Sequence, residues 1–135
     1  MAASRSKTVV SLAEGRKAPI PAGRRSAELL THGSLEIRFY APRGRDEQTP
    51  HTRDEVYVVV HGRGQFFRDG VRTPFGPGDL IFVPAGAEHR FENFTDDLEV
   101  WVAFYGPEGG ERPQAGDLST PAPNFPGFSE PSPAR

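Results

Sequence analysis

Residues 78–93, GDLIFVPAGAEHRFEN, constrain the fold of this chain more than any other segment. The apolar run at residues 80–83 predicts a strand, and the Pro-Ala-Gly sequence at residues 84–86 predicts a turn. His89 then stands at the start of a further strand. Because a turn of this kind can lift a histidine to the end of a strand, the segment predicts a small β-barrel with a metal ligand at its mouth.

The central part of the chain has the alternating pattern of β-strands. Apolar and polar side chains alternate over residues 35–40, and residues 55–61 are rich in valine. Asp69-Gly70 is a two-residue hairpin signal between two further strands. Strands are expected at residues 35–40, 55–61, 65–68, 71–75, 80–83, 89–94 and 98–105. Short strands at this spacing, without amphipathic helices between them, predict an all-β sandwich or barrel.

The length of 135 residues fits a single domain, whose barrel we place at residues 26–105. Residues 1–25 are basic and contain prolines that disfavour a helix, so we expect a loose N-terminal arm. Residues 106–135 are rich in proline and glycine, which predicts an irregular tail. In this tail Phe125 and Phe128 either pack against the barrel or a partner subunit, or belong to a mobile segment.

The composition excludes several classes of partner and site. With 16 basic and 18 acidic residues the net charge is −2, which argues against nucleic acid or an anionic membrane as the main partner. The chain has no cysteine, so a metal ion would need histidine, carboxylate or other oxygen ligands. No apolar run approaches the ~20 residues of a membrane helix, and no secretory signal is recognisable. We expect a soluble, cytoplasmic protein.

A second candidate segment contains His51 and Glu55. On one straight strand, residues four apart share a face but lie ~13 Å apart, too far to hold one ion at ~2.1 Å. A bend at residues 52–54 solves this, with His51 ending one strand and Glu55 starting the next. If this hairpin faces the one that carries His89, the three side chains converge in the mouth of the barrel.

Both segments match motifs of a known family. The pattern G-x5-P-x-G-x2-H-x3-N is matched at every named position, by Gly78, Pro84, Gly86, His89 and Asn93. Residues 34–105 resemble the cupin family on this basis. The resemblance implies a jelly-roll (double-stranded β-helix) barrel, usually a homodimer, that in many members binds one divalent metal through three histidines and one glutamate.

The family's other motif, G-x5-H-x-H-x3,4-E-x6-G, is matched from its second histidine onward by His51, Glu55 and Gly62. Thr49 stands where the family has its first histidine, and a hydroxyl is a poor ligand for a divalent metal. The resemblance therefore implies a metal site of His51, Glu55 and His89 with open positions, suited to Fe and compatible with Mn, Ni or Zn. The neighbouring Gln48 offers an amide oxygen, but we expect its side chain to point to the other face. A degenerate, empty site is the alternative.

Candidate contacts for a small-molecule substrate in the barrel are Thr49, Arg38, Tyr40, Tyr57 and Trp101. Arg38 and Tyr40 share one face of their strand. If this face lines the barrel, Arg38 can hold a substrate carboxylate; otherwise the face is a polar surface. Trp101 and Tyr105 share one face of the last strand, and either this face or the opposite one lines the cavity.

The leading functional interpretation is a metal-dependent enzyme that acts on a small organic molecule by dioxygenase-, isomerase- or lyase-type chemistry. A second interpretation is a non-catalytic barrel that binds or senses a small ligand. A third is a docking module in which the proline-rich tail contacts a partner.

Overall fold

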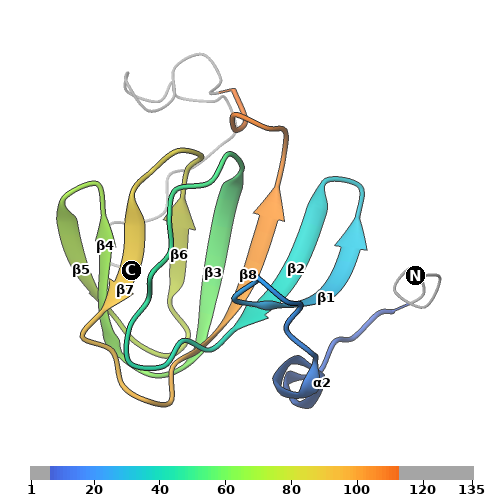
Figure 1. Ribbon diagram of the computed structural model, residues 1–135, viewed down its shortest axis with the longest axis horizontal. Coiled ribbons are helices and arrows are strands. Elements are labelled where there is room, and N and C mark those ends of the chain that lie inside the picture. The colour runs from blue at the N-terminus through green and yellow to red at the C-terminus, as the bar shows by residue number, and fades with distance from the viewer. Residues whose placement is uncertain (1–6, 113–135) are drawn as a thin grey trace, which may run out of the picture.

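The computed structural model describes residues 7–112, which fold into two antiparallel β-sheets facing each other (Figure 1). The larger sheet has the strand order β1-β2-β8-β3-β6, and the smaller has the order β5-β4-β7. The strands are β1 (Ala27–His32), β2 (Leu35–Tyr40), β3 (Asp54–His61), β4 (Gly64–Arg68), β5 (Val71–Phe75), β6 (Leu80–Val83), β7 (His89–Glu92) and β8 (Glu99–Tyr105). The arrangement confirms the all-β jelly-roll barrel. Phe125 and Phe128 lie outside the described residues.

The hydrophobic core lies between the two sheets. Tyr57, Val100 and Val102 from the larger sheet meet Phe66 and Phe91 from the smaller one, and all five are buried. A strand such as β3 was predictable because its alternate side chains, Tyr57 and Val59, face this core while Val58 faces outward. The expected hairpin is also present: β4 and β5 pair across residues 69–70, both of which have positive φ. The sequence analysis missed β1, whose side chains are mostly exposed or half-buried.

The N-terminal segment is not the loose arm that was predicted, because it contains the short helix α2 (Leu12–Lys17). The Ser11 hydroxyl accepts from the Glu14 N–H, and the Glu14 carboxylate accepts from the Ser11 N–H, which forms a capping box. The helix ends before the prolines that led us to exclude it. Within residues 7–112 no helix is long and apolar enough to cross a membrane.

Helix α2 covers part of the outer face of the larger sheet. Gly15 packs against Phe39 and Trp101, whose rings meet edge to face with centroids 5.0 Å apart. The Arg16 guanidinium donates two hydrogen bonds to the Glu99 carboxylate, at 2.8 and 2.9 Å. The helix therefore covers part of the half of this face that β2 and β8 form.

The other half of this outer face is apolar and exposed. Val58 on β3 and Leu80 and Phe82 on β6 keep 39%, 65% and 43% of their surface in contact with solvent. A groove of about 550 Å³ runs beside them, between the free edges of β5 and β6. We refer to Val58, Leu80 and Phe82 as the outer apolar patch.

Candidate metal centre

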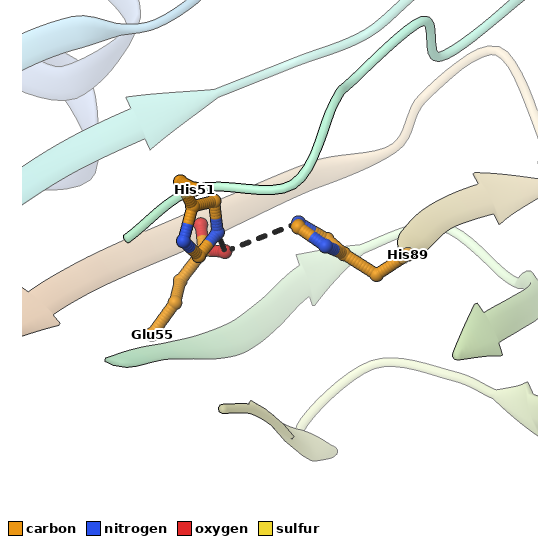
Figure 2. A group of neighbouring side chains, drawn as sticks. All are labelled: His51, Glu55 and His89. Atoms are coloured by element: carbon orange, nitrogen blue, oxygen red, sulfur yellow. Dashed lines mark hydrogen bonds and ion pairs between the residues drawn. The ribbon is translucent and has the colours of Figure 1, made fainter. Parts of the chain in front are cut away.

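The three predicted ligands converge on one point between the two sheets (Figure 2). Glu55 is the second residue of β3 and His89 the first of β7, whereas His51 lies in the loop before β3 and not at the end of a strand as predicted. One oxygen of Glu55, Oε1, lies 2.6 Å from His51 Nε2 and 3.4 Å from His89 Nε2. One ligand atom from each residue lies within 4.8 Å of the other two.

Backbone hydrogen bonds hold the two chain segments that carry the histidines together. The Gly86 N–H donates to the His51 carbonyl at 2.7 Å, which joins the Pro-Ala-Gly turn to the loop before β3. The Ala85 N–H donates to Asp54 Oδ1 at 2.9 Å, and Asp54 is buried. The turn before His89 is thus bonded directly to the residues that flank His51 and Glu55.

Each histidine ring is also oriented by the backbone. His51 Nδ1 lies 2.8 Å from the Arg53 carbonyl oxygen, and His89 Nδ1 lies 2.9 Å from the Ala87 carbonyl oxygen. A carbonyl only accepts, so both Nδ1 atoms carry the proton. In a neutral ring, Nε2 then carries a lone pair that points at Glu55. This tautomer, with the proton on Nδ1, can bind a metal through Nε2.

Neutral rings would therefore leave only hydrogen-bond acceptors facing each other, and these need a cation between them. Without a metal ion a proton can supply part of that charge. Burial alone would raise the pKa of Glu55, but hydrogen bonds from His51 and His89 hold it below its usual value. Burial likewise disfavours the charged imidazole, yet its contact with Glu55 raises the pKa of His89. Both shifts show that the cluster favours a positive charge next to the Glu55 carboxylate.

The donor set fits a divalent transition metal. Two imidazole nitrogens and one carboxylate are the ligand types that such ions prefer. Two atoms bound to one ion at ~2.1 Å and at right angles are ~3 Å apart, and the distances from Glu55 Oε1 to the two rings are of this order. The Phe104 ring packs edge to face on His51, with centroids 4.9 Å apart.

Gln48 reaches the cluster, which corrects our expectation that its side chain points away. Its Oε1 lies 3.2 Å from His89 Nε2 and accepts a hydrogen bond from the Tyr57 hydroxyl at 3.0 Å. Thr49, which occupies the position of the family's first histidine, is exposed instead. Residues 47–52 form no strand, so the alternation that we assumed for side-chain direction does not apply here.

A buried carboxylate, Asp46, holds the Gln48 amide. Its Oδ2 accepts from Gln48 Nε2 at 2.7 Å and from the Phe91 N–H at 2.8 Å, and its Oδ1 accepts from the Tyr40 hydroxyl at 2.5 Å. The sequence analysis missed Asp46. The polar pair at residues 46 and 48 was the available signal, but nothing in its spacing showed that both side chains turn inward.

A small cavity of about 50 Å³ adjoins the cluster. Its lining includes Glu55, Gln48, Tyr40 and Tyr57, so the structure places both predicted tyrosines in its wall. Burial raises the pKa of each phenol well above its usual value, which keeps both hydroxyls protonated as hydrogen-bond donors. Arg25, which the sequence analysis did not single out, is exposed at the rim of the same cavity.

Arg38 and Trp101, two other predicted substrate contacts, lie elsewhere. Arg38 is on the inner face of the sheet and almost fully buried, but its guanidinium donates to the hydroxyl and carbonyl of Ser26 and pairs with Glu36. Arg38 therefore supports Ser26, which lines the cavity, and its guanidinium is not free to hold a carboxylate. Trp101 is wrong as a cavity residue, because it lies on the outer face, beneath α2.

The model of the cupin domain family matches residues 36–105, and the chain therefore belongs to the cupin family. An uncharacterized protein of Streptomyces coelicolor is 43% identical over 83 residues, a match that covers 60% of this chain and 79% of the relative.

Two further similarities are more distant. An acireductone dioxygenase of Rhodopseudomonas palustris is 36% identical over 69 residues, which covers 41% of this chain and 42% of that enzyme. The chain thus matches less than half of the enzyme's length. A cupin 2 conserved barrel protein of Salinispora arenicola superposes with a TM-score of 0.54 at 20% identity, covering 74% of this chain and 90% of that one. The last similarity concerns the fold alone.

Proposed function

We propose that this protein is a metal-dependent cupin enzyme that holds one divalent ion (Fe, Mn, Ni or Zn) with His51, Glu55 and His89. The observation that carries the proposal is the convergence of two fixed imidazole lone pairs on one buried carboxylate. A structural histidine does not require its Nε2 lone pair to face other acceptors. A metal ligand does.

The proposed substrate is a small anionic organic molecule. A bound metal would polarise a substrate oxygen or support oxygen chemistry. Arg25 gives the rim of the cavity a positive charge, which attracts an anion, and Tyr40 and Tyr57 offer neutral hydroxyls to orient it. The distant similarity to acireductone dioxygenases makes dioxygenation the first reaction to assay, before isomerisation and lyase chemistry.

The second candidate function is a non-catalytic barrel that binds or senses a small ligand. The reduced ligand set favours it, because Thr49, at the position of the family's first histidine, is exposed and adds no third imidazole to the described cluster. A sensing protein would be stabilised by its ligand without converting it. Turnover of a candidate substrate by the metal-loaded protein would rule this function out.

Metal analysis of the purified protein tests the main proposal. We expect close to one divalent ion per chain in the wild type and almost none in His89→Ala. His61→Ala is the matched control, because His61 is half exposed, lies 3.9 Å from Glu99 and does not belong to the cluster of His51, Glu55 and His89. Equal metal content in the wild type and in His89→Ala would show that the three residues are not the ligands.

We also propose that the protein forms a homodimer through the outer apolar patch. A second copy is the occupant that we favour, because an apolar patch is complementary to itself and a two-fold axis brings the same residues together. The free edge of β6 lies beside the patch and offers backbone groups for additional pairing.

A further inference from the structure

We propose that Gln48 supplies a fourth protein ligand, through its side-chain amide oxygen, and that Asp46 is the positioning residue that turns this oxygen toward the metal. The inference rests on the proposed metal centre and deepens it. In this arrangement Gln48 takes the place of the histidine that the family has at the position of Thr49.

Position supports the first part of the inference. Gln48 Oε1 lies 3.2 Å from His89 Nε2, which is as near as Glu55 Oε1, at 3.4 Å. It approaches from the loop before β3, whereas Glu55 approaches from β3 itself. An amide oxygen is also a suitable ligand for a divalent cation.

The orientation of the amide follows from its partners. Asp46 Oδ2 lies 2.7 Å from one end of the amide and, as a carboxylate oxygen, can only accept, so the amide end that faces it must be the NH2 group. The opposite end is then the oxygen, which accepts from the Tyr57 hydroxyl. Asp46 is itself held as an acceptor by Tyr40 and by the Phe91 N–H.

The contact between Gln48 and His89 has no explanation as a hydrogen bond between neutral groups. His89 Nδ1 carries the proton because it faces the Ala87 carbonyl, so Nε2 of the neutral ring has no hydrogen to donate. Two acceptors 3.2 Å apart in a buried site repel each other unless a cation lies between them. A proton on His89 Nε2 would serve only one of its two acceptor neighbours, Gln48 Oε1 or Glu55 Oε1, whereas one metal ion would bind all of these atoms at once.

The experiment measures the affinity for Mn(II) and the number of water molecules bound to it, by EPR and water proton relaxation. Gln48→Leu removes the oxygen at nearly constant volume. We expect binding to weaken by about 10- to 100-fold and one additional water to enter the coordination sphere. Gln65→Leu, the same change on β4, is the matched control and should alter neither quantity. A merely structural role for Gln48 would not change the hydration number.

Asp46→Asn tests the positioning role. An asparagine no longer requires the NH2 end of Gln48, so we expect weaker Mn(II) binding in the wild-type background and no further loss in the Gln48→Leu background. An equal loss in both backgrounds would show that Asp46 does not act through Gln48. If Gln48→Leu does not fold, Gln48→Asn withdraws the oxygen by one methylene and should give the same loss.

The possible failures are distinguishable. Mn(II) binding that His89→Ala removes but Gln48→Leu leaves unchanged, with an unchanged hydration number, would overturn the role of Gln48 and keep the metal centre. A wild-type protein that binds no Mn(II) and contains no other divalent metal would overturn both.

Discussion

Gly62, the residue after β3 and the last named position of the motif that contains His51 and Glu55, offers a sharp test of how the barrel is held together. Its φ is +100°, and a Cβ at this position would lie 2.6 Å from the Cα of Leu98. Leu98 is fully buried, and a Cβ meets its backbone rather than the end of a flexible side chain. Gly62→Ala therefore adds backbone strain and a clash that only a shift of the main chain can relieve.

Gly70→Ala is the matched control, because Gly70 has a φ of +90° and no other atom within 4 Å of the added Cβ. The positive φ alone should destabilise this variant by about 1–2 kcal/mol. Gly62→Ala should lose about 1–3 kcal/mol more through overpacking. This total is a large part of the about 5–15 kcal/mol by which domains are stable.

Urea unfolding followed by tryptophan fluorescence measures both variants. We expect a clearly lower midpoint for Gly62→Ala than for Gly70→Ala, with similar slopes. Equal midpoints would show that the close approach of residue 62 to the Leu98 backbone is not the reason for a glycine at this position.

Three further variants probe the regions around the site. Arg16→Ala should lower the urea midpoint slightly at pH 7, because the hydrogen bond from Arg16 keeps the pKa of Glu99 low. This stabilisation is present above the unfolded pKa of about 4.5 and fades as the pH falls below it, so a midpoint difference that does not change with pH would contradict the reasoning. Asp54→Ala should cost about 1–3 kcal/mol and weaken metal binding without removing a ligand, because the N–H groups of Ala85 and Glu111 lose their acceptor; unchanged metal affinity by titration would show that the turn needs no such support. Phe82→Arg in the outer apolar patch should convert a dimer into a monomer in light scattering, and a wild-type monomer would refute the dimer.

The sequence predicted the strands well because their side chains alternate, but alternation does not tell which face is inside. Trp101 shows the limit: its neighbours Val100 and Val102 point into the core, and helix α2 gives Trp101 an apolar environment on the outer face. Both faces of β8 are thus apolar, and nothing in the local pattern distinguishes them. The helix itself was missed because it is short and stabilised by contacts with the sheet.

The ligand-bearing segments were predictable for another reason. Glu55 and His89 lie at the starts of regular strands, next to a turn whose residues define its shape. Gln48 and Asp46 lie in a loop without a regular period, where the direction of each side chain depends on tertiary partners such as Tyr40 and the Phe91 N–H. The motif therefore identified Thr49 as the position where this chain lacks the family's histidine. The structure shows that the neighbouring residue, Gln48, is the one that reaches the cluster.

This difference leads to a last prediction about Thr49→His, which restores the family's first histidine in sequence. Thr49 is exposed, and the network of Asp46 holds Gln48 in the space next to His89. A histidine at residue 49 should therefore remain outside the cluster, and the affinity for a divalent metal should stay within about threefold of the wild type, since a new ligand would contribute tenfold or more. Cu(II) EPR counts the bound imidazole nitrogens directly. We expect two nitrogens in the wild type and two in Thr49→His. A third nitrogen would show that the loop can bring residue 49 into the site, and hence that the Asp46–Gln48 network does not exclude this position.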